Sequence, residues 1–227
     1  MTALDLSKMV KIDFPENQYF NEPVKKKQVY LHHTVSGDNA YSVANGWKAS
    51  TERVAVTIII GKDGIIYQLF SSDKWAYHLG LKVQTFQENN EPFQWLDKTS
   101  IGIEILNWGG LVKHTDGCWY PGVWDGKTNV PILRLGKMQQ VQEYPGGFRG
   151  YYGFEKYTPA QIESLGQLLC FFNKKYNIPL AYNNDMWDIS KKALSGAAGI
   201  FTHVSVRKDK SDCHPQPELI QLLKSLT

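Results

Sequence analysis

Short apolar runs of strand length, separated by polar turns, dominate the first half of the chain. Four of them are rich in β-branched or aromatic residues, at 28–31, 54–60, 65–70 and 100–106. This composition and length favour buried strands. The second and third runs are separated by Lys62-Asp63-Gly64, whose Asp-Gly dipeptide predicts a hairpin turn. We therefore expect 54–60 and 65–70 to pair as antiparallel neighbours.

Two other segments have the periodicity of helices. Within residues 40–50, Tyr41, Ala44 and Trp47 recur at helical spacing and predict one buried face. A longer amphipathic helix is expected to begin at Thr158-Pro159, because threonine suits the N-cap and proline the first helical position. Helices of this kind are expected to cover the strands.

Composition indicates a folded protein and excludes several functions. Of the 227 residues, 42% are hydrophobic, and the net charge of +3 permits attraction to an anionic polymer such as a bacterial wall. No basic stripe interleaved with aromatic residues indicates nucleic-acid binding. No apolar run approaches the ~20 residues of a membrane span, and residues 1–12 lack the apolar core of a signal peptide. We therefore expect synthesis in the cytoplasm.

Two clusters carry candidate metal ligands. His32 and His33 follow the first apolar run directly, where a strand fixes the backbone and the imidazoles can face a cleft. Near the other end of the chain, His203 is followed nine positions later by Asp212 and then by Cys213. A catalytic zinc keeps three protein ligands, drawn from imidazole nitrogen, carboxylate oxygen and thiolate sulfur. His32 and His203, with either Asp212 or Cys213, would make such a set.

Glu104 is unusual because it lies inside the apolar run 100–106. A buried carboxylate is costly unless it is paired, and in a cleft poor in water its proton affinity rises. Glu104 is therefore a candidate general acid and base. The alternative is a glutamate at a strand edge that points into solvent.

Five blocks in this order resemble the zinc-dependent N-acetylmuramoyl-L-alanine amidases, a group that includes amidase-type phage lysozymes and peptidoglycan recognition proteins. The blocks are Leu-His-His-Thr at 31–34, then residues 59–69, 75–80, 100–105 and 203–215. The fold expected from this resemblance is α/β, a single domain of residues 1–227 with a central mixed sheet flanked by helices and zinc in a surface cleft.

Residues 108–157 depart from the family pattern, in which the connection after the glutamate strand is often shorter. This segment holds ten of the nineteen glycines and three of the seven tryptophans. We interpret it as an insertion near the cleft. Trp119 or Trp124 could stack on a glycan, although packing of the insertion onto the domain is the more common use of such a residue.

The resemblance also implies roles for individual residues. Glu104 is expected to move a proton from water to the leaving amine, and Lys210 to stabilise the oxyanion. Lys210-Ser211-Asp212 fits the carboxylate variant of the family motif, so its spacing favours Asp212 over Cys213 as a ligand. The residues expected at the zinc are His32, His203 and Asp212, and those expected at the substrate are His78, Trp75 and His33.

The activity implied is Zn²⁺-dependent hydrolysis of the amide bond between N-acetylmuramic acid and L-alanine of the peptidoglycan stem peptide. The expected partner is bacterial peptidoglycan or soluble muropeptides, and the protein is expected to be a monomer. We expect a phage or prophage endolysin that reaches the wall after release.

Two other functions stay open. A non-catalytic peptidoglycan-binding module would be expected to lack one ligand, whereas this chain keeps all three. A zinc peptidase that cuts within the stem peptide is disfavoured because no His-Glu-x-x-His motif is present.

Overall fold

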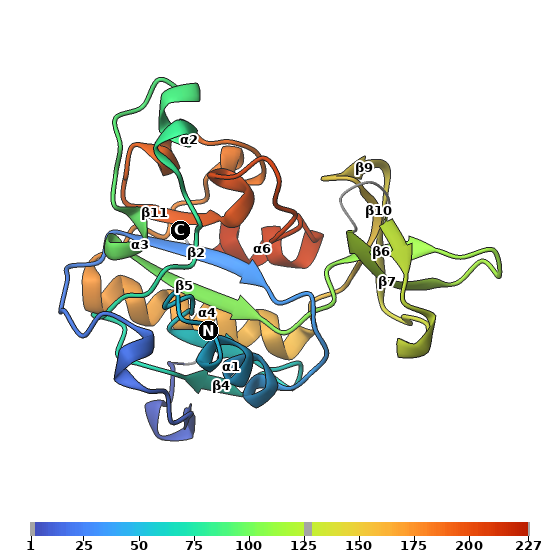
Figure 1. Cartoon of the computed structure of the whole chain (residues 1–227), viewed down its shortest axis with the longest axis horizontal. Coiled ribbons are helices and arrows are strands. Elements are labelled where there is room, and N and C mark those ends of the chain that lie inside the picture. The colour runs from blue at the N-terminus through green and yellow to red at the C-terminus, as the bar shows by residue number, and fades with distance from the viewer. Residues whose placement is uncertain (1–2, 125–128, 227) are drawn as a thin grey trace.

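Two separate β-sheets organise the chain in a computed structural model that describes residues 3–124 and 129–226 (Figure 1). The larger sheet has six strands in the order β1 (Val10–Lys11), β4 (Ile66–Gln68), β3 (Ile58–Ile60), β5 (Ser100–Ile105), β2 (Gln28–His33) and β11 (Gly199–Thr202). Only the β3–β4 pair is antiparallel. The predicted α/β fold with a mixed central sheet is therefore confirmed.

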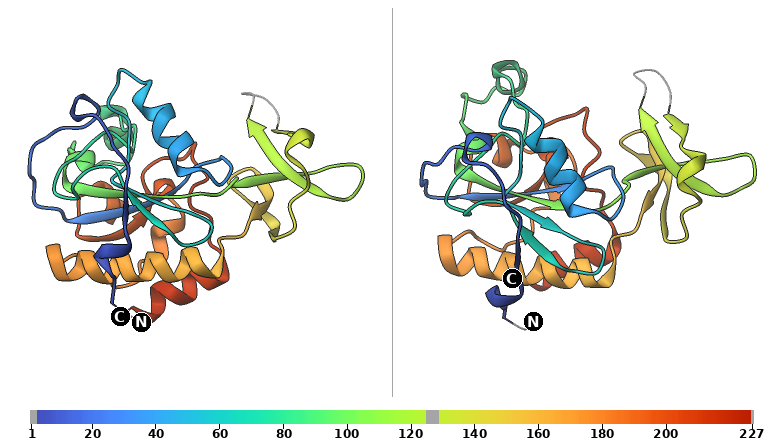
Figure 2. Two further views of the ribbon diagram at one scale, coloured as in Figure 1. Left: turned by 90° about the horizontal axis from the view of Figure 1, so that it is seen from below. Right: turned by 60° about the horizontal axis from the view of Figure 1, so that its bottom comes forward.

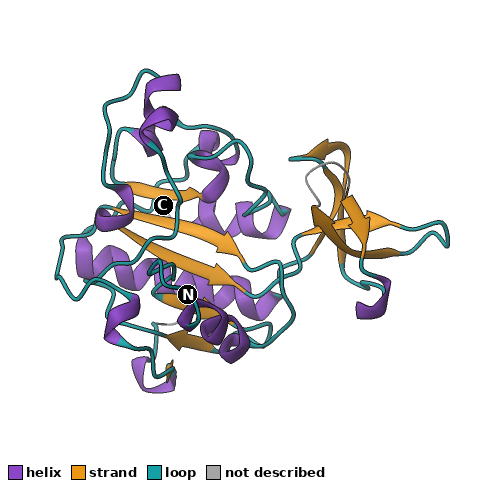
Figure 3. Ribbon diagram, in the orientation of Figure 1, coloured by secondary structure: helices purple, strands orange, loops and turns teal. Residues whose placement is uncertain are grey.

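Helices cover both faces of this sheet (Figures 2 and 3). The two longest near the C-terminus, α4 (Pro159–Tyr176) and α6 (Pro217–Ser225), lie on one face, and α1 (Ala40–Lys48) lies on the other. Shorter helices occur at α2 (Val83–Glu88), α3 (Leu96–Thr99) and α5 (Lys191–Leu194). Among the described residues, none of the helices is long and apolar enough to span a bilayer.

The strand β3 shows how the sequence separates the two faces. Ile58 and Ile60 join the larger core with residues of α4 and α6, whereas Ile59 joins a smaller core with residues of α1. Successive side chains of a strand point to opposite faces, so the continuous apolar run fits a sheet that is covered on both sides.

The hairpin and the helix at 159–176 are confirmed. Gly64 has a φ of +85° in the turn between β3 and β4, a conformation that favours glycine. Thr158 caps α4 with a reciprocal bond to Gln161, and Asn177 ends the helix in the left-handed conformation.

Other boundaries differ from the prediction. Only three residues of 54–60 form a strand, because Val54 instead bridges to Tyr77. The face of α1 is also shifted by one residue, so that Ala40 and Ala44 are buried and Tyr41 is 52% exposed. The expected burial of Tyr41 is therefore wrong.

Residues 108–157 fold mainly into a second sheet, which projects beyond one end of the central sheet (Figure 1). Its antiparallel strands run in the order β8 (Asn129–Pro131), β7 (Trp119–Trp124), β6 (Gly110–Lys113), β10 (Tyr151–Glu155) and β9 (Val141–Phe148). The indole of Trp119 covers Gly153, where an added Cβ would lie 2.7 Å from the ring. Trp119 is therefore a packing residue of the sheet, and the side chain of Trp124 lies outside the described residues.

Gln161 joins α4 to the end of the strand that carries Glu104. Its buried amide donates to the carbonyl of Leu106 at 2.8 Å and accepts from the backbone of Thr158 at 3.0 Å.

Gln161→Ala should lower the free energy of unfolding by about 2 kcal/mol, because the buried Leu106 carbonyl loses this donor and the helix loses its capping box. Urea unfolding measures the change, with Lys174→Ala on the exposed side of the same helix as control. Equal stability of both variants would contradict this account.

Candidate metal centre

Three parallel strands bring the candidate residues to one edge of the central sheet. β2 lies between β5 and β11, and the register of β2 with β5 places His32 directly beside Glu104. His203 follows the end of β11, where the chain turns into a short 3-10 helix. Since parallel strands end at a common edge, residues far apart in sequence meet there.

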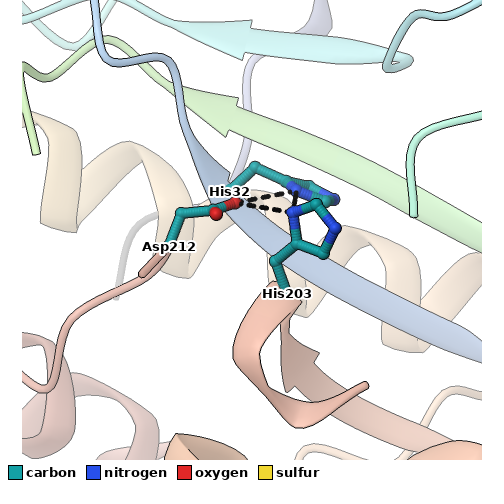
Figure 4. A group of neighbouring side chains, drawn as sticks. All are labelled: His32, His203 and Asp212. Atoms are coloured by element: carbon teal, nitrogen blue, oxygen red, sulfur yellow. Dashed lines mark hydrogen bonds and ion pairs between the residues drawn. The ribbon is translucent and has the colours of Figure 1, made fainter. Parts of the chain in front are cut away.

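Three side chains converge at this edge, from β2, from the end of β11 and from the loop that follows (Figure 4). The Nδ1 atom of His32 lies 3.1 Å from Nδ1 of His203 and 3.1 Å from Oδ2 of Asp212. The third separation, between His203 Nδ1 and Asp212 Oδ2, is 2.9 Å. All three residues are buried.

A chain of hydrogen bonds fixes the tautomer of His32. The hydroxyl of Ser100 donates to the Leu96 carbonyl at 2.6 Å, so its oxygen accepts from Nε2–H of His78 at 2.9 Å. Burial, with a further contribution from His32 and His203, lowers the pKa of His78 well below its ordinary value, so this ring is neutral. Its Nδ1 atom therefore accepts from Nε2–H of His32 at 3.0 Å, which leaves a lone pair on His32 Nδ1.

The tautomer of His203 is fixed in the same sense. Its Nε2 atom lies 3.0 Å from the Leu79 carbonyl, which can only accept, so Nε2 carries the hydrogen of this contact and Nδ1 is the nitrogen that faces Asp212. Two imidazole Nδ1 atoms and a carboxylate oxygen thus face one another at the same point. Such an arrangement offers the donor atoms that a metal cation binds.

The donor set fits a zinc ion. Ligand atoms of a tetrahedral Zn²⁺ with bonds of about 2.0–2.1 Å are about 3.3 Å apart, close to the separations observed here. Burial lowers the pKa of His32 to about 4, and electrostatic repulsion from His203 contributes to this shift. Neutral imidazole and ionised carboxylate are the forms that bind metal.

Cys213 points away from the three acceptors and into the larger core. Burial raises the pKa of its thiol well above the ordinary value, and the nearby hydroxyl of Tyr157 opposes this shift only in part. A buried neutral thiol is a poor metal ligand. The geometry therefore assigns the third ligand position to Asp212.

Glu104 and Lys210 line the same cavity as the three acceptors, a space of about 240 Å³. Glu104 is buried on a central strand, which excludes the alternative of a solvent-facing strand edge. Burial raises its pKa well above the ordinary value, the Asp212 carboxylate adds to the shift and Lys210 opposes it. A carboxyl in such a setting can both accept and return a proton near neutral pH.

The residues expected at the substrate have different positions. His78 and His33 line the cavity, but both nitrogens of His78 are bonded within the protein and His33 Nδ1 lies 3.1 Å from the hydroxyl of Tyr157. Trp75 does not line the cavity, because its ring stacks on Phe20 at 3.8 Å between centroids. A substrate contact by Trp75 therefore stays a prediction, and its ring lies outside the residues that line this cavity.

Sequence reasoning missed the residues that hold the histidines. Ser100 stands at the start of an apolar strand, a polar position that could have drawn attention. Asp97 accepts from the backbone N–H groups of His78 and Leu79 at 2.7 and 2.9 Å and fixes the loop that supplies both outer partners. Nothing in the local pattern around Asp97 predicts this contact, because it depends on the tertiary fold.

Comparison with known proteins gives the family context. A family model described as N-acetylmuramoyl-L-alanine amidase matches residues 21–217. No curated protein matches the chain in sequence.

Similar solved structures include PlyL, with a TM-score of 0.51, 14% identity and coverage of 96% of this chain and 98% of that chain. A mutant endolysin from Bacillus subtilis has a TM-score of 0.51 and 14% identity, with coverage of 96% of this chain and 96% of that chain. The catalytic domain of PlyG has a TM-score of 0.50 and 14% identity, with coverage of 96% of this chain and 93% of that chain. These likenesses establish the fold.

His78→Phe removes the acceptor that holds His32 Nε2–H and frees His32 to exchange tautomers. Metal affinity should fall by about 10- to 100-fold, the usual cost of losing an outer partner of a ligating histidine. Competition between the protein and a chromophoric chelator for Zn²⁺ measures the change, and circular dichroism checks the fold. Wild-type affinity in a folded His78→Phe protein would show that the hydrogen-bond chain does not orient the ligand.

Proposed function

Because the chain belongs to the N-acetylmuramoyl-L-alanine amidase family, we propose that it cleaves its peptidoglycan amide bond with a zinc ion held by His32, His203 and Asp212. The observation that carries this proposal is the convergence of three acceptor atoms within 2.9–3.1 Å of one another. Two imidazoles and one carboxylate are a common donor set of catalytic zinc, which keeps one position open. When bound, such an ion supplies Lewis-acid chemistry that polarises the scissile carbonyl and makes water nucleophilic at neutral pH.

Glu104 is the proton carrier in this proposal. Its carboxylate accepts a proton from the attacking water and returns it to the nitrogen of the leaving L-alanine, so that the C–N bond breaks as the amine forms. The raised pKa of Glu104 favours the return step, and the ammonium of Lys210 opposes the shift enough to keep the ionised form accessible. One side chain can therefore serve both proton transfers.

Lys210 stabilises the negative charge that develops on the attacked carbonyl oxygen. It lines the cavity with Glu104 and the three ligands, and no salt bridge in the described parts of the chain ties it to a carboxylate. A single well-placed donor of this kind contributes about 10²–10³ in rate. His78 acts one step further out, where it keeps His32 in the ligand tautomer.

The biological role that we propose is that of a phage or prophage endolysin. The Bacillus subtilis endolysin of similar fold supports this choice only by analogy. Digestion of intact sacculi beside soluble muropeptides, with products identified by mass, tests it. Strong preference for the soluble substrate would favour a role in muropeptide recycling over wall lysis.

Asp212→Ala should lose both zinc and activity, because it removes the only carboxylate of the ligand set. Cys213→Ser should retain both, since the thiol lies in the core and away from the metal. Metal analysis by mass spectrometry and amidase turnover are the two measurements. If Cys213→Ser empties the site while Asp212→Ala remains active, the assignment of the third ligand is wrong.

Glu104→Gln preserves the shape of the side chain and removes the proton acceptor. Turnover should fall by about 10²–10⁴, whereas zinc content should stay at about one ion per chain. Loss of zinc from this variant would identify Glu104 as a ligand and contradict its proposed role as the base.

A further inference from the structure

The second sheet is fastened beside the metal centre at two places. In the turn between β9 and β10, the guanidinium of Arg149 donates to the Lys208 carbonyl at 3.2 Å and to Asp188 at 2.6 Å. Close to the ligand loop, the ring of His214 stacks on Phe154 of β10, with 4.7 Å between centroids. These contacts hold the second sheet against the segment that supplies Asp212.

A groove of about 660 Å³ lies between this sheet and the loop 208–212. It continues the metal cavity, because Val35, Lys210 and Asp212 line both spaces. A substrate bound with its scissile amide at the three ligands therefore has a direct path into the groove.

The groove carries uncompensated positive charge. Asp209 is bound by Arg207, and Arg149 is bound by Asp188, so these two pairs contribute little net charge. Lys208 is exposed and Lys210 half-buried, and in the described ranges no salt bridge joins either of them to a carboxylate. A ligand with free carboxylates matches this side of the groove.

The rest of the lining is largely apolar. Val35 and Val123 are 51% and 41% exposed, on the loop after β2 and on β7 respectively. Trp108, Ile132 and Tyr151 complete this wall. Such a surface suits aliphatic side chains and methylene groups and offers few fixed polar groups for sugar hydroxyls.

We propose that this groove binds the acidic stem peptide of the substrate, so that the second sheet and the loop 208–212 determine which peptides are cleaved. The inference rests on the proposed amidase function, because it orients the substrate by its scissile amide. The peptide leaves the metal centre toward the second sheet, with its carboxylates near Lys208 and its aliphatic portions against Val35 and Val123.

Three soluble substrates with the same N-acetylmuramoyl group test the proposal. One carries a stem peptide with free carboxylates, one carries the same peptide with its carboxylates amidated, and one ends at L-alanine. Zinc-loaded wild type should prefer the free-carboxylate peptide by about 2- to 5-fold in kcat/KM, the size of an exposed ion pair. The preference should shrink at high ionic strength, because salt screens exposed charges.

Lys208→Gln should move the free-to-amidated ratio of kcat/KM toward one, whereas Lys191→Gln, at an exposed lysine of α5, should leave it unchanged. A second pair separates charge from shape. Val123→Asp should reverse the preference, because the new carboxylate repels the free carboxylates of the peptide. Val123→Asn should not, because asparagine has nearly the shape of aspartate without its charge.

Different failures have different meanings. If the zinc-loaded protein cleaves neither these three substrates nor intact sacculi, the proposed function fails. If it cleaves them and the ratio is the same in wild type, Lys208→Gln and Val123→Asp, the proposed function stands and the peptide groove is overturned. If these variants instead change the cleavage of a substrate with a longer glycan and the same stem peptide, and do not respond to peptide charge, the groove holds the glycan and the proposed orientation is reversed.

Discussion

The candidate metal centre depends on the close approach of three buried polar atoms from distant parts of the chain. His32 Nδ1, His203 Nδ1 and Asp212 Oδ2 are all acceptors, yet the fold holds them within 2.9–3.1 Å of one another. Burial excludes water from this cluster, so each polar contact in and around it has a strong effect on its geometry. The surrounding structure must therefore be rigid enough to keep the three atoms in place, and the hydrogen bonds on the outer nitrogens of both histidines provide that rigidity.

The sheet supplies the remaining geometry. Parallel pairing of β2 with β5 sets Glu104, the proposed proton carrier, beside His32, a proposed ligand, and pairing of β2 with β11 brings His203 to the same edge. Strong apolar packing on both faces fixes these strands, so the core positions the backbone that carries the polar residues at their ends. Variation in the connecting loops can then change substrate recognition while the metal geometry is kept.

Much of the central sheet could be predicted from sequence because its strands are short, apolar and bounded by clear turns. The ligand set followed from donor chemistry and from the family resemblance. The second sheet was not predictable, because Trp119 covers Gly153 only after β7 and β10 have been brought into one sheet by the fold. For the same reason the stacking of Trp75 on Phe20, which lies far away in sequence, could not be predicted from the local pattern. Periodicity places residues on faces, but it does not say which face meets which.

The loop residues His78 and Leu79 connect the two histidines of the candidate metal centre, so changes in this loop affect both of them. His78 holds one ligand through its ring, and the carbonyl of the next residue, Leu79, holds the other. The carboxylate of Asp97 accepts hydrogen bonds from the backbone N–H groups of both residues. The two histidine ligands therefore share one support, and they are expected to become ordered or disordered together. In evolution, a change in this loop would therefore act on both histidines at once, so that their orientations would vary together and not independently.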